Sequence, residues 1–168
     1  MVLTKSELND SLKKEVRILL HLTGKLDRTQ LDYRPGPKQR SAIELMRYLS
    51  FMGPTLIQAA KSGFDREKWQ AAVHAAEKQG FDELVSTIAA QPAVYDTLLA
   101  DMSDDDFRGE MTGFDGKKTS RGAFIVSLVL GGSAAYRTQL FLYLKACGRE
   151  ELSTMNLWQG VDPPPPSA

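Results

Sequence analysis

The chain of 168 residues carries 21 lysines and arginines against 21 aspartates and glutamates, so its formal net charge is zero and does not favour a nucleic-acid-binding protein. Its length suits one domain with a sizeable core. The chain has a single cysteine, and its N-terminal segment does not resemble a signal peptide. No apolar run approaches the roughly 20 residues that a membrane span needs. We therefore predict a cytoplasmic protein with neither a membrane nor a nucleic-acid partner.

Helical spacing dominates the sequence from its start. The first helix is predicted from Ser6 to Leu26, and Thr4 with Glu7 fits a capping box that satisfies its first backbone donors. Residues of one buried helix face recur there at three- and four-residue steps: Leu12, Val16, Leu19, Leu20 and Thr23. Pro35 and Pro37 then interrupt the helical pattern, because proline lacks a backbone donor and keeps its predecessor extended.

A second helix is predicted to begin after Ser41, where Ser41 and Glu44 form another capping box. Gly53 and Pro54 should kink or split this helix, because the proline ring removes one hydrogen bond of the helical ladder.

The middle of the chain contains a short and a long helix. The short helix spans residues 67–79 and ends at Gly80 as a C-cap. The long helix runs from Asp82 to Met102 and is expected to bend at Pro92. Its apolar positions are Leu84, Ile88, Val94, Leu98 and Leu99.

The segment after this helix begins with an acidic run at residues 103–106 and is predicted to be a loop containing a short hairpin that turns at Asp115 and Gly116. A last long helix runs from Ser120 to Gly148. It contains Gly131 and Gly132 side by side, although each glycine in a helix interior costs roughly 1 kcal/mol relative to alanine.

The C-terminal segment is predicted to be irregular. Leu157 and Trp158 should dock on the helices, while residues 163–168 form a proline-rich extended tail. Four main helices within one domain of residues 1–162 predict an all-α, up-and-down four-helix bundle.

Three features occur in a characteristic order: the linker with Pro35 and Pro37, the sequence SAIELMRYL on the second helix, and GGSAAYRTQLFLYLKACG on the fourth. Together they resemble the DinB-like superfamily of four-helix bundles, which includes metal-dependent thiol S-transferases and maleylpyruvate isomerases. The resemblance covers nearly the whole chain. It implies a DinB-like bundle that associates as a homodimer.

Metal-binding members of that superfamily use one histidine on the second helix and two histidines four residues apart on the fourth. The matching positions here are Tyr48, Gly132 and Tyr136. Glycine has no side chain, and a tyrosine with a pKa of about 10 is mostly protonated at neutral pH and is a poor metal ligand. The resemblance therefore implies a degenerate metal site, and we expect neither a bound metal nor another cofactor.

The remaining reactive side chains have ordinary structural interpretations. We expect His21 to be partly buried and hydrogen-bonded, His74 to lie on an exposed helix face, and Cys147 to pack at the end of the last helix rather than act as a nucleophile. Glu44 could point inward, although its capping box explains it more simply.

Two interpretations of the degenerate site remain open. In the first, which we favour, the tyrosines fill the former metal site as ordinary packing. In the second, the site is a small-molecule pocket whose candidate residues are Tyr48, Gly132, Tyr136, Arg137, Gln139 and Glu44. The favoured function is a metal-free small-molecule-binding or interaction protein rather than an enzyme. The alternative is a thiol-dependent S-transferase or isomerase that works without metal or with an atypical ion.

Overall fold

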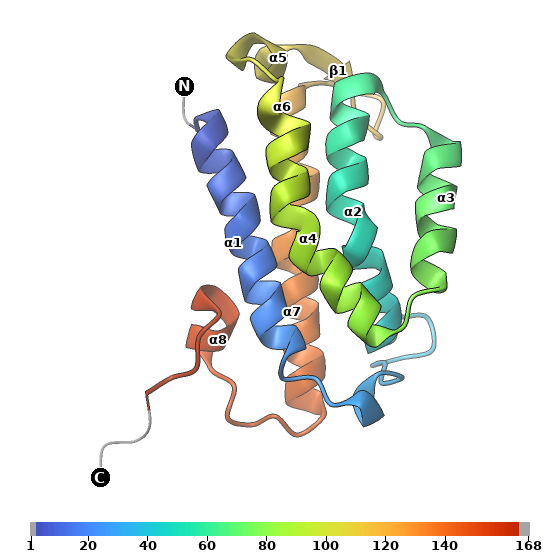
Figure 1. Ribbon diagram of the computed structural model, residues 1–168, viewed down its shortest axis with the longest axis vertical. Helices are drawn as coiled ribbons and strands as arrows, with labels where there is room; N and C mark the ends of the chain where they lie inside the picture. The colour runs from blue at the N-terminus through green and yellow to red at the C-terminus, as the bar shows by residue number, and fades with distance from the viewer. Residues whose placement is uncertain (1–2, 165–168) are drawn as a thin grey trace.

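The computed structural model describes residues 3–164 and confirms the all-α bundle (Figure 1). Its four long helices are α1 (Lys5–Thr23), α2 (Ala42–Ser62), α4 (Phe81–Ala100) and a continuous helix formed by α6 (Arg121–Phe124), η2 (Ile125–Leu130) and α7 (Gly131–Ala146). The smaller elements are η1 (Arg28–Gln30), α3 (Arg66–Glu77), α5 (Asp104–Arg108), β1 (Glu110–Thr112), β2 (Lys118–Ser120) and α8 (Thr154–Gln159).

The direction of the helices departs in one respect from a strict up-and-down order. Helix α3 returns the chain along the outside of α2, so α2 and α4 run in the same direction (Figure 1). The ends of both helices meet accordingly, with Lys61 of α2 donating to the Leu98 carbonyl at 2.7 Å and pairing with Asp101 at 2.5 Å. Helices α1 and α7 run in the opposite direction (Figure 1).

The bundle interior is apolar and contains side chains from all four long helices. In α1, the predicted face is buried at Leu12, Val16, Leu19 and Thr23, whereas Leu20 is half-buried. The largest fully buried side chains of the described residues are Tyr95, Leu12, Ile18, Leu22, Leu45, Met46, Met52, Ile57, Leu84, Ile88, Leu99 and Ile125.

Pro54 does not split α2, because a side chain from α4 replaces the missing backbone donor. A proline at position 54 leaves the Ser50 carbonyl without its helical partner. Gln91, which is buried, donates its Nε2 to that carbonyl at 3.0 Å and to the Leu49 carbonyl at 2.8 Å. The Gln91 Oε1 in turn accepts from the Tyr95 hydroxyl at 3.1 Å.

Gly53 lets Tyr95 approach α2. A Cβ atom at residue 53 would overlap the Tyr95 hydroxyl, so only glycine fits there without a shift. Helix α4 also continues through its own proline, Pro92, and changes direction along its length (Figure 1).

Three local predictions are wrong. The acidic run forms the short helix α5, because Ser103 and Asp106 close a capping box. Gly80 is not a C-cap but the N-cap residue of α4, and its N–H donates to Glu83 at 2.8 Å. The C-terminal segment is not irregular throughout, because the short helix α8 begins directly after its N-cap residue, Ser153.

The predicted hairpin is present: β1 and β2 pair antiparallel, with Met111 opposite Thr119, and Gly116 takes a φ of 77° in the turn. Pro163 and Pro164 have no regular secondary structure, whereas residues 165–168 of the predicted tail lie outside the described residues.

Within residues 3–164, the 26-residue helix Arg121–Ala146 is long and apolar enough, by length and composition alone, to cross a membrane. The sequence prediction, based on uninterrupted apolar runs, did not identify it. This helix is the fourth member of the bundle and packs against α1 and α2, which accounts for part of its apolar character.

Candidate functional site

Tyr48 on α2 and Tyr136 on α7 meet at the position where the superfamily resemblance places a metal. Their ring centroids lie 5.0 Å apart and the rings cross at 68°, an edge-to-face contact. Tyr48 also contacts Phe51 at 5.6 Å and Trp69 of α3 at 6.3 Å between ring centroids. The two tyrosines therefore belong to an aromatic cluster that extends outward to α3.

Gly132 lies on the same side of α7, and a cavity of about 350 Å³ opens beside it. We call this space the aromatic cavity. It is lined by Tyr48, Leu56, Phe64, Trp69, Phe114, Ser127, Leu128, Gly132 and Tyr136. The three positions matched to the metal ligands thus converge on one cavity, as the resemblance implied.

A π-helix immediately precedes the glycine pair. Over Ile125–Leu130 the backbone follows the wider π pattern, and the Gly131 N–H donates to the Val126 carbonyl five residues earlier. Such segments are rare and occur frequently at functional sites. Here the π-helix contributes Ser127 and Leu128 to the wall of the aromatic cavity.

Gly132 itself has ordinary space around it. A Cβ atom at this residue would lie 3.5 Å from the Met52 Cε and 3.7 Å from its Sδ, both normal van der Waals distances. The glycine therefore does not exist to let the helices approach closely. Its effect is to leave volume beside the tyrosines.

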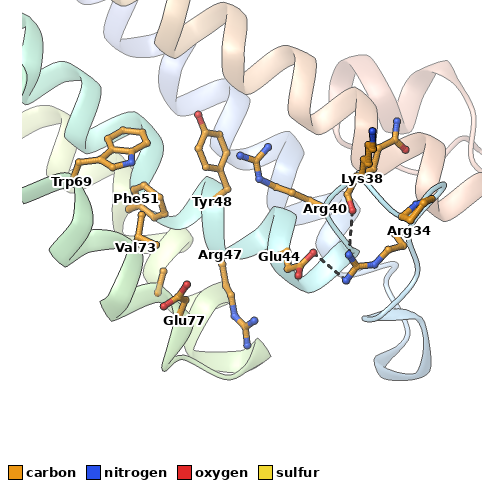
Figure 2. Close-up of a pocket in the computed structure, with 13 residues that line it drawn as sticks. Arg34, Lys38, Arg40, Glu44, Arg47, Tyr48, Phe51, Trp69, Val73 and Glu77 are labelled. Atoms are coloured by element: carbon orange, nitrogen blue, oxygen red, sulfur yellow. Dashed lines mark hydrogen bonds and ion pairs between the residues drawn. The ribbon is translucent and has the colours of Figure 1, made fainter. Parts of the chain in front are cut away.

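A second, larger pocket of about 520 Å³ is also lined by Tyr48 (Figure 2). We call it the cationic pocket, because four basic side chains and two carboxylates line it. Its lining residues are Arg34, Pro37, Lys38, Gln39, Arg40, Glu44, Arg47, Tyr48, Phe51, Trp69, Val73, Ala76 and Glu77. Tyr48 and Trp69 line both cavities, so the two lie next to each other.

Arg40 lines the cationic pocket and lies against the rings of both tyrosines. Its guanidinium carbon lies 4.2 Å from the centroid of the Tyr48 ring and 5.9 Å from that of Tyr136, within the range of cation–π contacts. Figure 2 shows the guanidinium beside the Tyr48 ring.

The backbone of Arg40 is held from α7. The Tyr143 hydroxyl donates to the Arg40 carbonyl at 2.8 Å and accepts from the Gln139 side-chain amide. Gln139 was predicted to contact a ligand. Instead, it holds the Tyr143 hydroxyl and thereby fixes the backbone segment that carries Arg40.

The Tyr48 phenol is neutral at physiological pH. Burial, followed by the adjacent Tyr136 phenol, raises the pKa of Tyr48 to about 12, although the nearby Arg40 acts in the opposite direction. A phenol with this pKa can donate or accept a hydrogen bond, but it does not supply an anionic base or a metal ligand near neutral pH.

Glu44 forms its predicted capping box but lines the cationic pocket rather than the aromatic cavity. It completes the capping box, accepting from the Ser41 N–H at 2.7 Å, and it lines the cationic pocket, where it pairs with Arg34 at 3.2 Å. The Ser41 N–H is the main reason why the pKa of Glu44 lies below its usual value.

Arg137, the remaining predicted pocket residue, lies elsewhere. It is buried against Glu15 of α1, with its Nε 2.5 Å from the carboxylate, and it donates to the Leu157 carbonyl of α8. It also lies 5.5 Å from the ring of Trp158, which remains 62% exposed rather than docking into the core. Arg137 therefore joins three helices and does not line either cavity.

The histidines and the cysteine lie away from the aromatic cavity. His21 is half-buried and its Nε2 lies 3.0 Å from the Asn156 amide, while His74 is exposed on α3. Burial raises the pKa of the Cys147 thiol, which disfavours its nucleophilic form. Across residues 3–164, no three His, Cys, Asp or Glu side chains are grouped as metal ligands would be.

Several residues of the site were not identified from the sequence. Arg40, Phe64 and Phe114 lie in connections without helical periodicity, and Trp69 lies on a short helix with a weak pattern.

Comparison with solved structures places the fold. The chain is similar to a DinB-like protein, YjoA, from Bacillus subtilis, with a TM-score of 0.66 and 18% identity over 87% of this chain and 94% of that one. It is also similar to a mutant of the mycothiol-dependent maleylpyruvate isomerase, with a TM-score of 0.58 and 12% identity over 83% of this chain and 60% of that one. No family model and no curated protein matches the sequence. These similarities show that the chain has the DinB-like fold.

Proposed function

We propose that this DinB-like chain is a metal-free small-molecule-binding protein and that the aromatic cavity is its ligand site. The observation that carries this proposal is the volume beside Gly132, at the position where the superfamily pattern places a metal ligand. If packing alone had replaced the metal, the tyrosines would fill this space. Instead, a cavity of about 350 Å³ remains next to them.

The dimensions and chemistry of the cavity suit a small, flat, largely apolar ligand. Its volume lies near the lower end of the roughly 300–1,000 Å³ range of small-molecule sites. Five aromatic side chains line it, and the two phenols and Ser127 provide polar groups that could orient a ligand. The single cysteine supports a cytoplasmic location for this function.

The alternative, a thiol-dependent transferase or isomerase, is supported by the shared fold of the maleylpyruvate isomerase. A fold alone does not carry an activity. The neutral phenol of Tyr48 offers no strong base, and the raised pKa of Cys147 disfavours a thiolate nucleophile. These groups favour binding over catalysis.

The first prediction tests the ligand site by fluorescence. The chain has two tryptophans, and Trp69 lines the cavity whereas Trp158 is exposed on α8. In a Trp158→Phe background, Trp69 is the only tryptophan reporter. We expect saturable quenching when 2-naphthamide, a neutral flat aromatic probe, is titrated into this protein.

Gly132→Leu should abolish this quenching, because Met52 closes one side of the residue and a longer side chain must extend into the cavity. Gly131→Leu is the matched control, since Gly131 is exposed and does not line the cavity. Circular dichroism verifies that both variants fold. Absence of quenching in the parent, or equal quenching in both variants, would exclude the aromatic cavity as the ligand site.

A further inference from the structure

We infer that the ligand is an anion, specifically an aromatic carboxylate whose ring enters the aromatic cavity while its carboxylate binds Arg40. This inference rests on the proposed function and adds the chemical class of the ligand. It is carried by the uneven charge of the cationic pocket and by the position of Arg40 over both tyrosines.

The cationic pocket has more basic groups than acidic ones, although the whole chain has no net charge. Arg34 is already paired with Glu44. Figure 2 shows Arg47 and Glu77 extending away from Arg40, toward the other end of the pocket. Lys38 and Arg40 form no ion pair with a carboxylate in the described part of the chain. Arg47 also forms no ion pair in the described part of the chain, so three of the four cations are unpaired, and of these Arg40 lies against the tyrosines.

Arg40 is the cation best placed to bind such a ligand. Arginine can stack on an aromatic face and still present N–H donors to a carboxylate. Because its guanidinium lies against Tyr48 and Tyr136, an anion bound to it lies beside the aromatic cavity that Tyr136 lines.

The backbone around Arg40 is also organised before a ligand binds. Tyr143, buried on α7, donates to the Arg40 carbonyl, and Gln139 holds the Tyr143 hydroxyl. These bonds fix the start of the Arg40 side chain without occupying its guanidinium. A preorganised donor loses less conformational entropy when it binds.

The experiment compares 2-naphthoate with 2-naphthamide, which share the same ring system but differ in charge. Binding is followed by Trp69 fluorescence in the Trp158→Phe protein. We expect the carboxylate to bind about tenfold more tightly, the size of effect that a partly exposed charge-assisted contact can provide. Because the contact is accessible to solvent, this preference should decrease as the salt concentration rises.

Arg40→Gln should reduce the preference for the carboxylate to less than about twofold, because the charged contact is lost. Lys38→Gln tests another unpaired cation of the pocket and should reduce the preference by a smaller factor. Lys14→Gln is the charge-matched control, because Lys14 is exposed on α1 and lines neither cavity. It should retain the full preference.

The outcomes separate the two proposals. Equal binding of naphthoate and naphthamide overturns the anion inference and leaves the ligand site intact. A carboxylate preference that survives both Arg40→Gln and Lys38→Gln also overturns it, because the anion then binds elsewhere. If neither probe binds, the proposed function fails and the inference fails with it.

Discussion

At the scale of single residues, two glycines that look alike in the sequence have different roles. Gly53 lies in α2 and Gly132 in α7, two of the long helices of the bundle. Each glycine lowers the stability of its helix by roughly 1 kcal/mol relative to alanine. A Cβ atom at Gly53 would overlap the buried Tyr95 hydroxyl, whereas one at Gly132 would lie 3.5 Å from Met52.

We therefore expect opposite effects from the same substitution. Gly132→Ala should raise the free energy of unfolding by up to about 1 kcal/mol, because helix propensity improves and nothing is displaced. Gly53→Ala should lower it by about 1–3 kcal/mol through overpacking against Tyr95. Urea denaturation measures both. A destabilising Gly132→Ala would show that this glycine is needed for packing and would favour the plugged-site interpretation.

The residue scale also shows how the matched positions lie in the fold. Gly132 and Tyr136 share one face of α7 because they are four residues apart, and the packing of α2 brings Tyr48 beside them. Arg137 was assigned to the same site by its proximity in sequence. Adjacent residues on a helix point in different directions, however, and Arg137 faces Glu15 instead.

At the scale of elements, capping boxes and apolar periodicity predicted the long helices within a few residues of their ends. The π-helix Ile125–Leu130 could not be predicted, because its apolar sequence is equally compatible with an α-helix. Nor could the partner of Pro54 be identified, since Gln91 lies on a different helix and only the packing of α2 against α4 brings the two together.

The bond between Gln91 and the Ser50 carbonyl gives a prediction at this scale. Gln91→Met should lower the free energy of unfolding by about 1–3 kcal/mol, because it leaves buried carbonyls without a donor. In a Pro54→Ala background the cost should be smaller, since alanine restores the helical N–H to Ser50. Gln70→Met, at an exposed position of α3, serves as the control. Equal losses in both backgrounds would show that Gln91 does not compensate for the proline.

At the scale of the whole molecule, the fourth helix carries exposed apolar side chains. Val126 is 39% and Leu142 is 58% exposed, although this helix is the most apolar of the bundle by length and composition. Exposed apolar surface of this kind is typical of interaction sites. The monomer alone therefore does not account for the composition of this helix.

We predict that a second copy covers this surface and that the protein is a homodimer with the two-fold symmetry most common among such assemblies. Sedimentation at micromolar concentration should give about twice the chain mass of 18.6 kDa. Leu142→Glu should shift the protein toward the monomer, whereas Val94→Glu, on the exposed side of α4, should not. A parent protein that sediments as a monomer throughout the accessible range contradicts the prediction.

The buried pair of Glu15 and Arg137 has a consequence for how the chain is made. The two residues are 122 positions apart, and Arg137 also bonds the Leu157 carbonyl near the C-terminus. During synthesis, at roughly 5–20 residues per second, α1 emerges from the ribosome many seconds before α7. Until Arg137 is available, Glu15 has no cation to pair with in the interior. Burial of its charged carboxylate alone would be costly, so this part of α1 stays exposed to water. Closure of the bundle around this pair is thus delayed until the last helices are released.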